Sequence, residues 1–141
     1  MPRGRFLFPA VLIFIVLLSS CVGAIGSIEV DLGQEFSLAL GQSAVIRGEN
    51  LEITFEEVIG DSRCPSDVQC VWEGRATYLI QIADGSASYK LTLSEPGLSD
   101  EGGSETYRDY QIVSHLEPYP ISGKEISKGE YRLLLTVSKV P

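Results

Sequence analysis

The residues of this sequence that could carry chemistry are concentrated in one short segment, residues 61–74 (DSRCPSDVQCVWEG). It holds two of the three cysteines, Cys64 and Cys70, and the only tryptophan, Trp72. A pair of cysteines can form a structural disulfide, work as a redox couple or bind a metal ion. The spacing of the two cysteines and the other ligand types in the chain decide among these three chemistries.

The inventory favours a structural disulfide between Cys64 and Cys70. Five residues separate them, which is not the C-x-x-C spacing of thioredoxin-like redox sites. A tetrahedral zinc site needs more cysteine or histidine ligands than the single histidine, His115, can add. A copper(I) site would favour thioether ligands, and the only methionine is Met1. We therefore expect a short disulfide loop and neither a metal ion nor another cofactor.

An aromatic residue and three charged residues surround this loop. Trp72 is predicted to be a packing anchor rather than a platform for a ligand, because large aromatic side chains contribute much of the packing in a core. Asp61, Arg63 and Asp67 could form, together with Trp72, a binding rim. Against this, an aspartate at a turn commonly caps its own backbone, and an arginine between two acidic residues commonly makes a local ion pair.

Other catalytic and metal-binding patterns are weak. His115 lies near Ser114 and Ser122 in the sequence, but no G-x-S-x-G motif or triad order accompanies them, so we expect an exposed histidine. One acidic group elsewhere in the chain consists of Asp100, Glu101, Glu105 and Asp109. Its spacing is not that of an EF-hand loop, which favours a solvated acidic loop over a calcium site. We therefore expect a protein that is not an enzyme.

The start of the chain has the layout of a secretory signal. A short basic segment precedes the apolar run 6–18 (FLFPAVLIFIVLL), and small residues follow that run. Residues 18–21 (LSSC) resemble the lipobox of bacterial lipoproteins. The resemblance implies cleavage before the cysteine and attachment of a diacylglycerol to its sulfur. Residues 1–20 are therefore predicted to be a lipoprotein signal peptide, with Cys21 as the lipidation site.

An uncleaved membrane anchor is the alternative. No charged residue lies between Arg5 and Glu29, and about 20 apolar residues suffice to span a bilayer. Small and polar residues dilute the second half of this stretch, which favours cleavage. In either case residues 28–141 are expected outside the cytoplasm, tied to a membrane by the short tether 21–27, because the basic start favours a cytoplasmic N-terminus.

The predicted mature domain is strongly acidic. The whole chain has 11 Lys and Arg residues and 19 Asp and Glu residues. Removal of Arg3 and Arg5 leaves nine basic against 19 acidic residues, a net charge of −10. A domain of this charge repels nucleic acid and anionic lipid headgroups. We therefore expect no nucleic-acid partner and attribute the charge mainly to solubility.

Alternating apolar residues predict a series of short strands in a single domain, residues 28–141. The alternation, which is typical of half-buried strands, occurs in residues 36–40, 44–46, 51–55, 76–82, 89–93, 110–116 and 131–137. Glu56 and Glu57 break the phase and predict a bulge or a strand end. Asp84-Gly85 suits a type I′ turn in the clearest hairpin. Residues 94–109 have no apolar period and are predicted to be a mobile loop.

This pattern predicts the fold class. About seven short strands separated by turns, with no convincing helical period, are typical of an all-β protein. We predict an antiparallel two-sheet sandwich, with an Ig-like arrangement or a small barrel as the alternative. The strand order does not follow from the sequence.

The cysteine segment also resembles the signature of a largely uncharacterised family of small extracytoplasmic proteins, many of which carry lipoprotein signals. The shared pattern, DSRCPxxVxCVWxG, runs from Asp61 to Gly74. A later PYP (residues 118–120) and a closing strand led by Tyr131 are similar as well. The resemblance implies a β-rich domain outside the cytoplasm and implies no activity.

These observations favour a membrane-tethered, extracytoplasmic β-sandwich lipoprotein with a non-enzymatic binding or scaffolding role in the cell envelope. The expected contact surfaces are the loops beside the disulfide and residues 94–109, because loops on a rigid scaffold often carry recognition. The expected partners are the membrane, through the lipid anchor, and a protein of the envelope. The alternative function is a protease inhibitor that presents a loop to an enzyme cleft, and a hydrolase is the weakest hypothesis.

Overall fold

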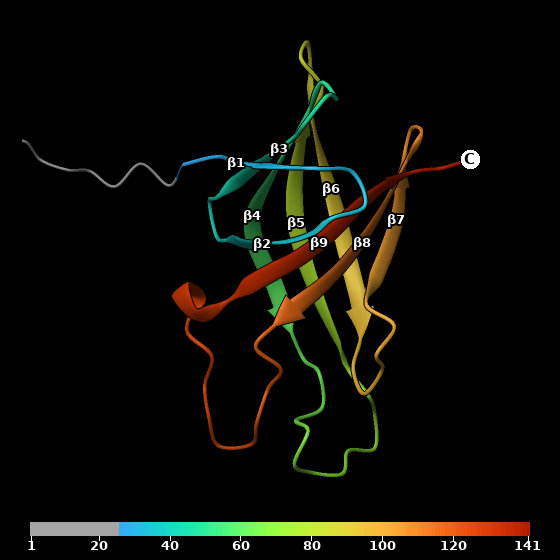
Figure 1. The fold of residues 1–141 in the computed structure, drawn as a ribbon. Coiled ribbons are helices and arrows are strands. Elements are labelled where there is room, and N and C mark those ends of the chain that lie inside the picture. Colours follow the sequence, from blue (N-terminus) through green and yellow to red (C-terminus); the bar gives the residue numbers. More distant parts are fainter. Residues whose placement is uncertain (1–25) are drawn as a thin grey trace, which may run out of the picture.

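Two stacked β-sheets make up the part of the chain that the computed structural model describes, residues 26–141 (Figure 1). The elements are β1 (Ile28–Val30), β2 (Glu35–Ala39), β3 (Ser43–Ile46), β4 (Leu51–Asp61), β5 (Arg75–Ala83), β6 (Ser88–Pro96), β7 (Gly103–Tyr107), β8 (Tyr110–Glu117), the 3₁₀ turn η1 (Lys128–Glu130) and β9 (Arg132–Lys139). The strand order is β1-β3-β4-β5-β6 in one sheet and β2-β9-β8-β7 in the other. The predicted all-β, two-sheet sandwich is confirmed, and within residues 26–141 β1 and β3 form the one parallel pair.

The predictions for the N-terminal segment lie largely outside the described residues. The signal peptide (1–20) and Cys21 belong to the segment 1–25, which the structure does not describe. Within residues 26–141, no helix has the length and apolar character needed to cross a bilayer.

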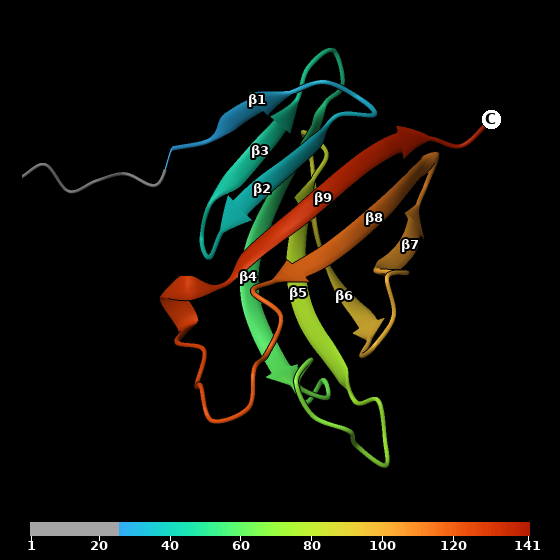
Figure 2. The same cartoon turned by 60° about the horizontal axis from the view of Figure 1, so that its bottom comes forward.

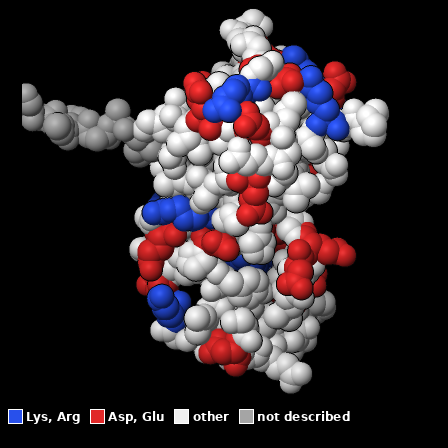
Figure 3. Space-filling model, in the orientation of Figure 1, with Lys and Arg blue, Asp and Glu red and all other residues white. Residues whose placement is uncertain are grey.

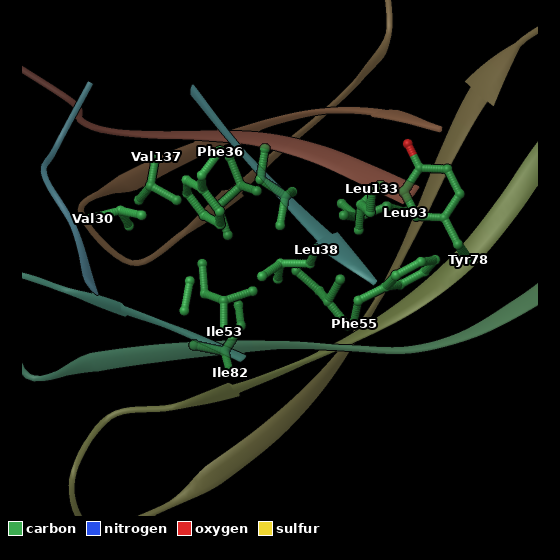
Figure 4. Packing of buried hydrophobic residues seen from close by; sticks show 14 of the residues in the cluster. Val30, Phe36, Leu38, Ile53, Phe55, Tyr78, Ile82, Leu93, Leu133 and Val137 are labelled. Atoms are coloured by element: carbon green, nitrogen blue, oxygen red, sulfur yellow. The ribbon is translucent and has the colours of Figure 1, made fainter. Parts of the chain in front are cut away.

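The core lies between the two sheets and follows the alternation in the sequence. The inward-facing residues of β5, which are fully buried, are Ala76, Tyr78, Ile80 and Ile82. Figure 4 shows Leu38 of β2 and Phe55 of β4, from opposite sheets, close together in this core. Tyr78 lies at one end of the apolar cluster, where its hydroxyl leaves the apolar surroundings. The alternation of apolar and polar residues in the sequence therefore identified the buried face of most strands.

The doubled glutamates mark a bulge and not the end of a strand. The pairing of β4 with β5 shifts between Phe55 and Glu57 and again between Val58 and Gly60. A bulge inserts an extra residue and bends the strand, while the ladder continues on both sides. β4 therefore runs on to Asp61 and carries that carboxylate to the end of the sandwich.

The hairpin β5–β6 is confirmed, but its turn differs from the predicted type I′. Ala83 pairs with Ser88, so four residues connect the strands. A two-residue type I′ turn needs positive φ at both central positions. Gly85 has a φ of 84°, whereas Asp84 is not among the residues with positive φ. The chain instead closes a wider loop, in which the amide of Asp84 donates to the carbonyl of Ala87 over 3.1 Å.

The predicted mobile loop over residues 94–109 is wrong for most of its length. β6 continues to Pro96, and β7 forms an edge of the four-stranded sheet. The alternation of apolar residues misses β7 because only Gly103 of this strand is buried, and the middle of the strand is polar and exposed. The loop proper is limited to residues 97–102.

Truncation of a central side chain tests this core. Phe55→Ala should lower the free energy of unfolding by about 3–5 kcal/mol, because it leaves a cavity between the two sheets. Urea unfolding of the protein measures the change. The exposed valine of β8 provides the control: Val113→Ala should change the same free energy by no more than about 0.5 kcal/mol. Equal losses in both variants would contradict the packing described here.

Candidate functional site

Three loops gather at one end of the sandwich (Figures 1 and 2). They are residues 62–74, between β4 and β5; residues 97–102, between β6 and β7; and residues 118–127, after β8. We call these three segments the loop end. Two views that differ by 60° both place them together, at the end opposite the turn of the β5–β6 hairpin.

Hydrogen bonds join the three loops into one unit. The amide of Ser66 donates to the carbonyl of Pro120 over 3.1 Å, which links the first loop to the third. The amide of Leu98 donates to the hydroxyl of Tyr119 over 2.8 Å, which links the second loop to the third. The loop end is therefore a connected surface and not a set of independent segments.

The first loop is closed by the predicted disulfide. Cys64 and Cys70 are bonded, with their Cα atoms 5.9 Å apart, so the predicted disulfide is confirmed. Below the bridge, the ladder between β4 and β5 continues into the loop. Ser62 donates from its amide to the carbonyl of Arg75 over 2.9 Å, and Cys64 donates to that of Glu73 over 2.8 Å. The loop is therefore fixed both by backbone pairing and by a covalent bond.

Gly74 is needed where this loop returns to the sheet. Its φ is 67°, in the left-handed region that favours glycine. A Cβ at this position would overlap the carbonyl oxygen of Ser62. Its own carbonyl accepts a hydrogen bond of 3.0 Å from the amide of Gly97 in the second loop. The absence of a side chain at Gly74 thus allows the two ends of the first loop to approach each other, and the carbonyl of Gly74 links them to the second loop.

Beneath the loop end lies the guanidinium of Arg63, whose side chain has no exposed surface. Its Nε and Nη2 donate to the carboxylate of Asp61 over 2.8 and 2.7 Å. Its Nη1 donates to Glu95 over 2.8 Å and to the carbonyl of Leu116 over 2.7 Å. A last bond of 3.1 Å reaches the carbonyl of Pro118. All five donors of the guanidinium are thereby used within the protein.

The ring of Tyr119 completes the surroundings of this cation. The guanidinium carbon of Arg63 lies 4.9 Å from the centroid of the ring, within the range of a cation–π contact. Because the same tyrosine accepts the amide of Leu98, its position depends on two loops at once. Arg63 thus fixes the first loop to the third, and Tyr119 fixes the third to the second.

Glu95 is the second buried carboxylate of the cluster and is only 2 % exposed. It accepts the amide of Leu116 over 3.0 Å and the hydroxyl of Tyr78 over 3.3 Å. The hydroxyl of Tyr78 also lies 2.7 Å from that of Ser114. The half-exposed ring of His115 brings its Nδ1 to 3.4 Å from Glu95. Within residues 26–141, no buried side-chain nitrogen or oxygen lacks a hydrogen-bond partner.

The electrostatics of the cluster favour its charged form. Burial alone would raise the pKa of the Asp61 carboxyl, but the hydrogen bonds and the charge of Arg63 outweigh burial and lower that pKa. Burial alone would likewise lower the pKa of the Arg63 guanidinium, and Asp61 raises it instead. Burial raises the pKa of the Tyr78 hydroxyl, which stays protonated and able to donate. The ion pair is therefore maintained in spite of its removal from water.

The predicted binding rim is divided between the interior and the surface. Asp61 and Arg63 lie beneath the loops with their side chains almost fully buried, and they form the local ion pair and backbone cap that the sequence suggested. Asp67 is exposed and accepts the amide of Ser122 over 2.8 Å, together with its hydroxyl. These bonds lower the pKa of Asp67. Asp67 therefore belongs to the surface and ties the first loop to the third.

The prediction that Trp72 is a packing anchor is wrong. The residue is 83 % exposed, and its neighbour Val71 is 91 % exposed. The interior position behind the disulfide is occupied by Arg63 and its hydrogen-bond partners, which leaves the indole ring outside. Of the four rim residues, Trp72 and Asp67 are thus the two that an external molecule can reach.

The other sequence-based candidates do not come together. Within residues 26–141, no group of three or more His, Cys, Asp or Glu side chains is placed to hold a metal ion. The acidic candidates for calcium are spread over the second loop, β7 and the β7–β8 turn. Ser114 is buried against Tyr78, whereas Ser122 lies in the third loop against Asp67. Within residues 26–141, neither serine hydroxyl is hydrogen-bonded to His115, whose ring lies against Glu95 instead.

The residues that the sequence analysis missed are Glu95 and Tyr119. Glu95 continues the inward phase of Leu91 and Leu93 along β6, so the period of two would have placed it inside, had acidic residues been included in the pattern. The packing of Tyr119 under a cation depends on the folded chain and leaves no local signal.

Replacement of Asp61 should reduce the pH dependence of stability in the acidic range. Folding lowers the pKa of this carboxyl, so its stabilising effect is complete above its ordinary value of about 3.9 and is lost as the pH falls through the lowered value. Asp61→Asn should cost about 3–5 kcal/mol at neutral pH, because it removes one of the two carboxylates that pair with the buried Arg63.

Urea unfolding at several pH values measures this effect. The difference between Asp61→Asn and the native chain should shrink as the pH falls. Asp109→Asn, at an exposed position in the β7–β8 turn, is the control and should show no comparable loss at neutral pH. A constant difference at every pH would contradict the assigned role of Asp61.

Comparison with known proteins adds no relative. No protein-family model matches the sequence, and no curated protein or solved structure gives a significant match.

Proposed function

We propose that this chain is a membrane-tethered, extracytoplasmic lipoprotein with a non-enzymatic binding or scaffolding role in the cell envelope, and that the loop end is its contact surface. The observation that carries this proposal is the combination of exposure and rigidity. Val71 and Trp72 are exposed directly after Cys70, in a loop that contains the disulfide and that the fully hydrogen-bonded Arg63 holds from beneath.

Physical considerations connect this combination with binding. A large aromatic side chain gains free energy when it leaves water, and Trp72 finds no such burial within the described fold. A surface that is already ordered loses little conformational entropy when it binds a partner. The cluster below the loop has no unsatisfied donor within the described residues and lies inside the protein, so it supports a positioning role better than a catalytic one.

The placement of the chain terminus supports a tether. β1 begins at Ile28, only a few residues after Cys21. In both ribbon views β1 lies away from the loop end, toward the opposite end of the sandwich (Figures 1 and 2). A lipid at Cys21 would therefore hold the domain near the membrane with the loop end directed away from the point of attachment.

Replacement of Cys21 tests the tether. Cys21→Ala should abolish incorporation of a labelled fatty acid and release the protein from the membrane fraction. Ser20→Ala is the matched control, because it keeps a small residue before the cysteine and should retain both the label and membrane attachment. Membrane retention of Cys21→Ala with an unchanged mass would instead support the uncleaved signal anchor.

A protease inhibitor is the second candidate, and one observation favours it. The first loop contains a disulfide and exposes bulky apolar side chains where the backbone bends, at Val71 and Trp72 directly after Cys70. Protease inhibitors bind through preorganised loops of this general kind, with interfaces of standard size.

An inhibition assay separates the two candidates. If the loop occupies an enzyme cleft, the protein should slow at least one protease that prefers large apolar side chains, and Trp72→Ala should relieve the inhibition. Val113→Ala, with an exposed apolar residue outside the loop end, should inhibit as the native chain does. A panel of serine, cysteine and metalloproteases that all run at an unchanged rate would remove this candidate.

A further inference from the structure

We infer that the loop end docks onto a partner protein, and that this partner offers an apolar pocket for the indole of Trp72 bordered by basic side chains. The inference rests on the proposed binding role and adds to it the anchor residue and the class of partner.

Exposed apolar residues are concentrated at the loop end. Nine large apolar residues are exposed within residues 26–141, and five of them belong to its three loops: Val68, Val71, Trp72, Leu98 and Ile121. The loops that carry them are hydrogen-bonded to one another, so the residues belong to one connected surface. Contiguous exposed apolar surface with a polar border is typical of interaction sites.

Charge limits the kind of partner. The exposed charged residues of the three loops are Asp67, Glu73, Asp100, Glu101 and Glu125, against Lys124 alone, which gives a net charge of −4. The charge of Arg63 does not change this balance at the surface, because Asp61 and Glu95 neutralise it in the interior. On the face shown in Figure 3, the loop end is largely uncharged, with mainly acidic side chains at its margins. A basic surface around an apolar pocket is the complement of this pattern.

A depression between the loops can accept one of these basic side chains. Its volume is about 330 Å³. It is lined by Ser66, Leu98, Ser99, Asp100, His115 and Tyr119. Asp100 supplies a carboxylate at its edge, and no salt bridge within the described residues occupies that carboxylate. The partner thus inserts a cation into this depression, on the same loop end that carries Trp72.

Charge and position favour a partner protein over the other occupants of such a surface. A second copy of the chain would bring the same excess of acidic residues to the interface, and like charges in an interface are costly. An anionic bilayer would repel the surface for the same reason. The loop end also lies away from β1, through which the chain leaves toward the tether (Figure 2).

Trp72 has the properties of an interface anchor. Tryptophan is enriched among the residues that dominate binding energy, and these residues fill pockets surrounded by weaker contacts. Val71, Leu98 and Ile121 supply exposed apolar surface in the same three loops. The disulfide and the Arg63 cluster fix the loop before binding, which reduces the entropy lost on association.

Photo-crosslinking with the full-length protein in intact cells that make it identifies the occupant. A photoreactive phenylalanine analogue is placed at Leu98 or Ile121, and at Thr92, an exposed position of β6, as the control site. We expect a discrete protein adduct from the two loop-end positions and not from Thr92. The same positions combined with Trp72→Ala should lose that adduct.

Affinity measurements with the partner identified by mass spectrometry complete the test. With the full-length protein in detergent, Trp72→Ala should raise the Kd about 30-fold or more. Glu73→Lys and Asp100→Lys should each raise the Kd about tenfold, with a smaller effect at high salt. Val113→Ala and Asp109→Lys, outside the loop end, are the controls and should leave the Kd unchanged.

Each of the other possible results would contradict the inference and would identify a different occupant or contact site. A lipid adduct from the loop end would assign the surface to a membrane, and an adduct of two copies would assign it to self-association. A protein adduct from Thr92 alone would contradict the loop end as the contact surface and would leave a binding role at another surface. Absence of a protein adduct from every position would contradict both. An identified partner whose Kd is insensitive to Trp72→Ala would exclude the indole as the anchor.

Discussion

The buried guanidinium of Arg63 is the interaction on which the loop end depends. A cation removed from water is tolerated only when its donors are satisfied and its charge is paired. Here the partners come from the end of β4 (Asp61), from β6 (Glu95) and from the end of β8 and the residue after it (Leu116 and Pro118). Movement of any one segment would leave the others with unpaired buried groups. The cluster therefore specifies a single arrangement of the loops, whatever its net contribution to stability.

The sheets deliver these partners through ordinary strand geometry. The bulges of β4 extend that strand to Asp61, and the inward phase of β6 turns Glu95 toward the same space. Tyr78 marks the boundary, because its ring packs in the apolar core whereas its hydroxyl joins the polar cluster. The sandwich thus changes from an apolar to a polar interior at the end that carries the exposed loops.

Patterns among neighbouring residues in the sequence predicted the features of the fold that depend mainly on neighbouring residues. The alternation of apolar residues located most strands and the buried face of β5. The small number of metal-ligand residues and the spacing of Cys64 and Cys70 predicted the disulfide between them. β7 was missed because an edge strand with polar exposed residues carries no such alternation. The exposure of Trp72 was missed because the local sequence does not show which side chain of the loop enters the interior; that side chain is Arg63, through contacts with segments distant in the sequence.

Two independent constraints act on the loop that carries Trp72. The disulfide shortens the loop covalently, and the ion pair of Arg63 fixes its base without contributing exposed surface. Neither constraint brings the indole into the core. The apolar cluster between the two sheets does not include Trp72. A flexible loop could fold an exposed tryptophan back onto the protein, but this loop is held in a conformation that keeps it in water. Within residues 26–141 no segment covers the apolar surface of Trp72, and this exposure is the physical argument for the contact surface that we propose at the loop end.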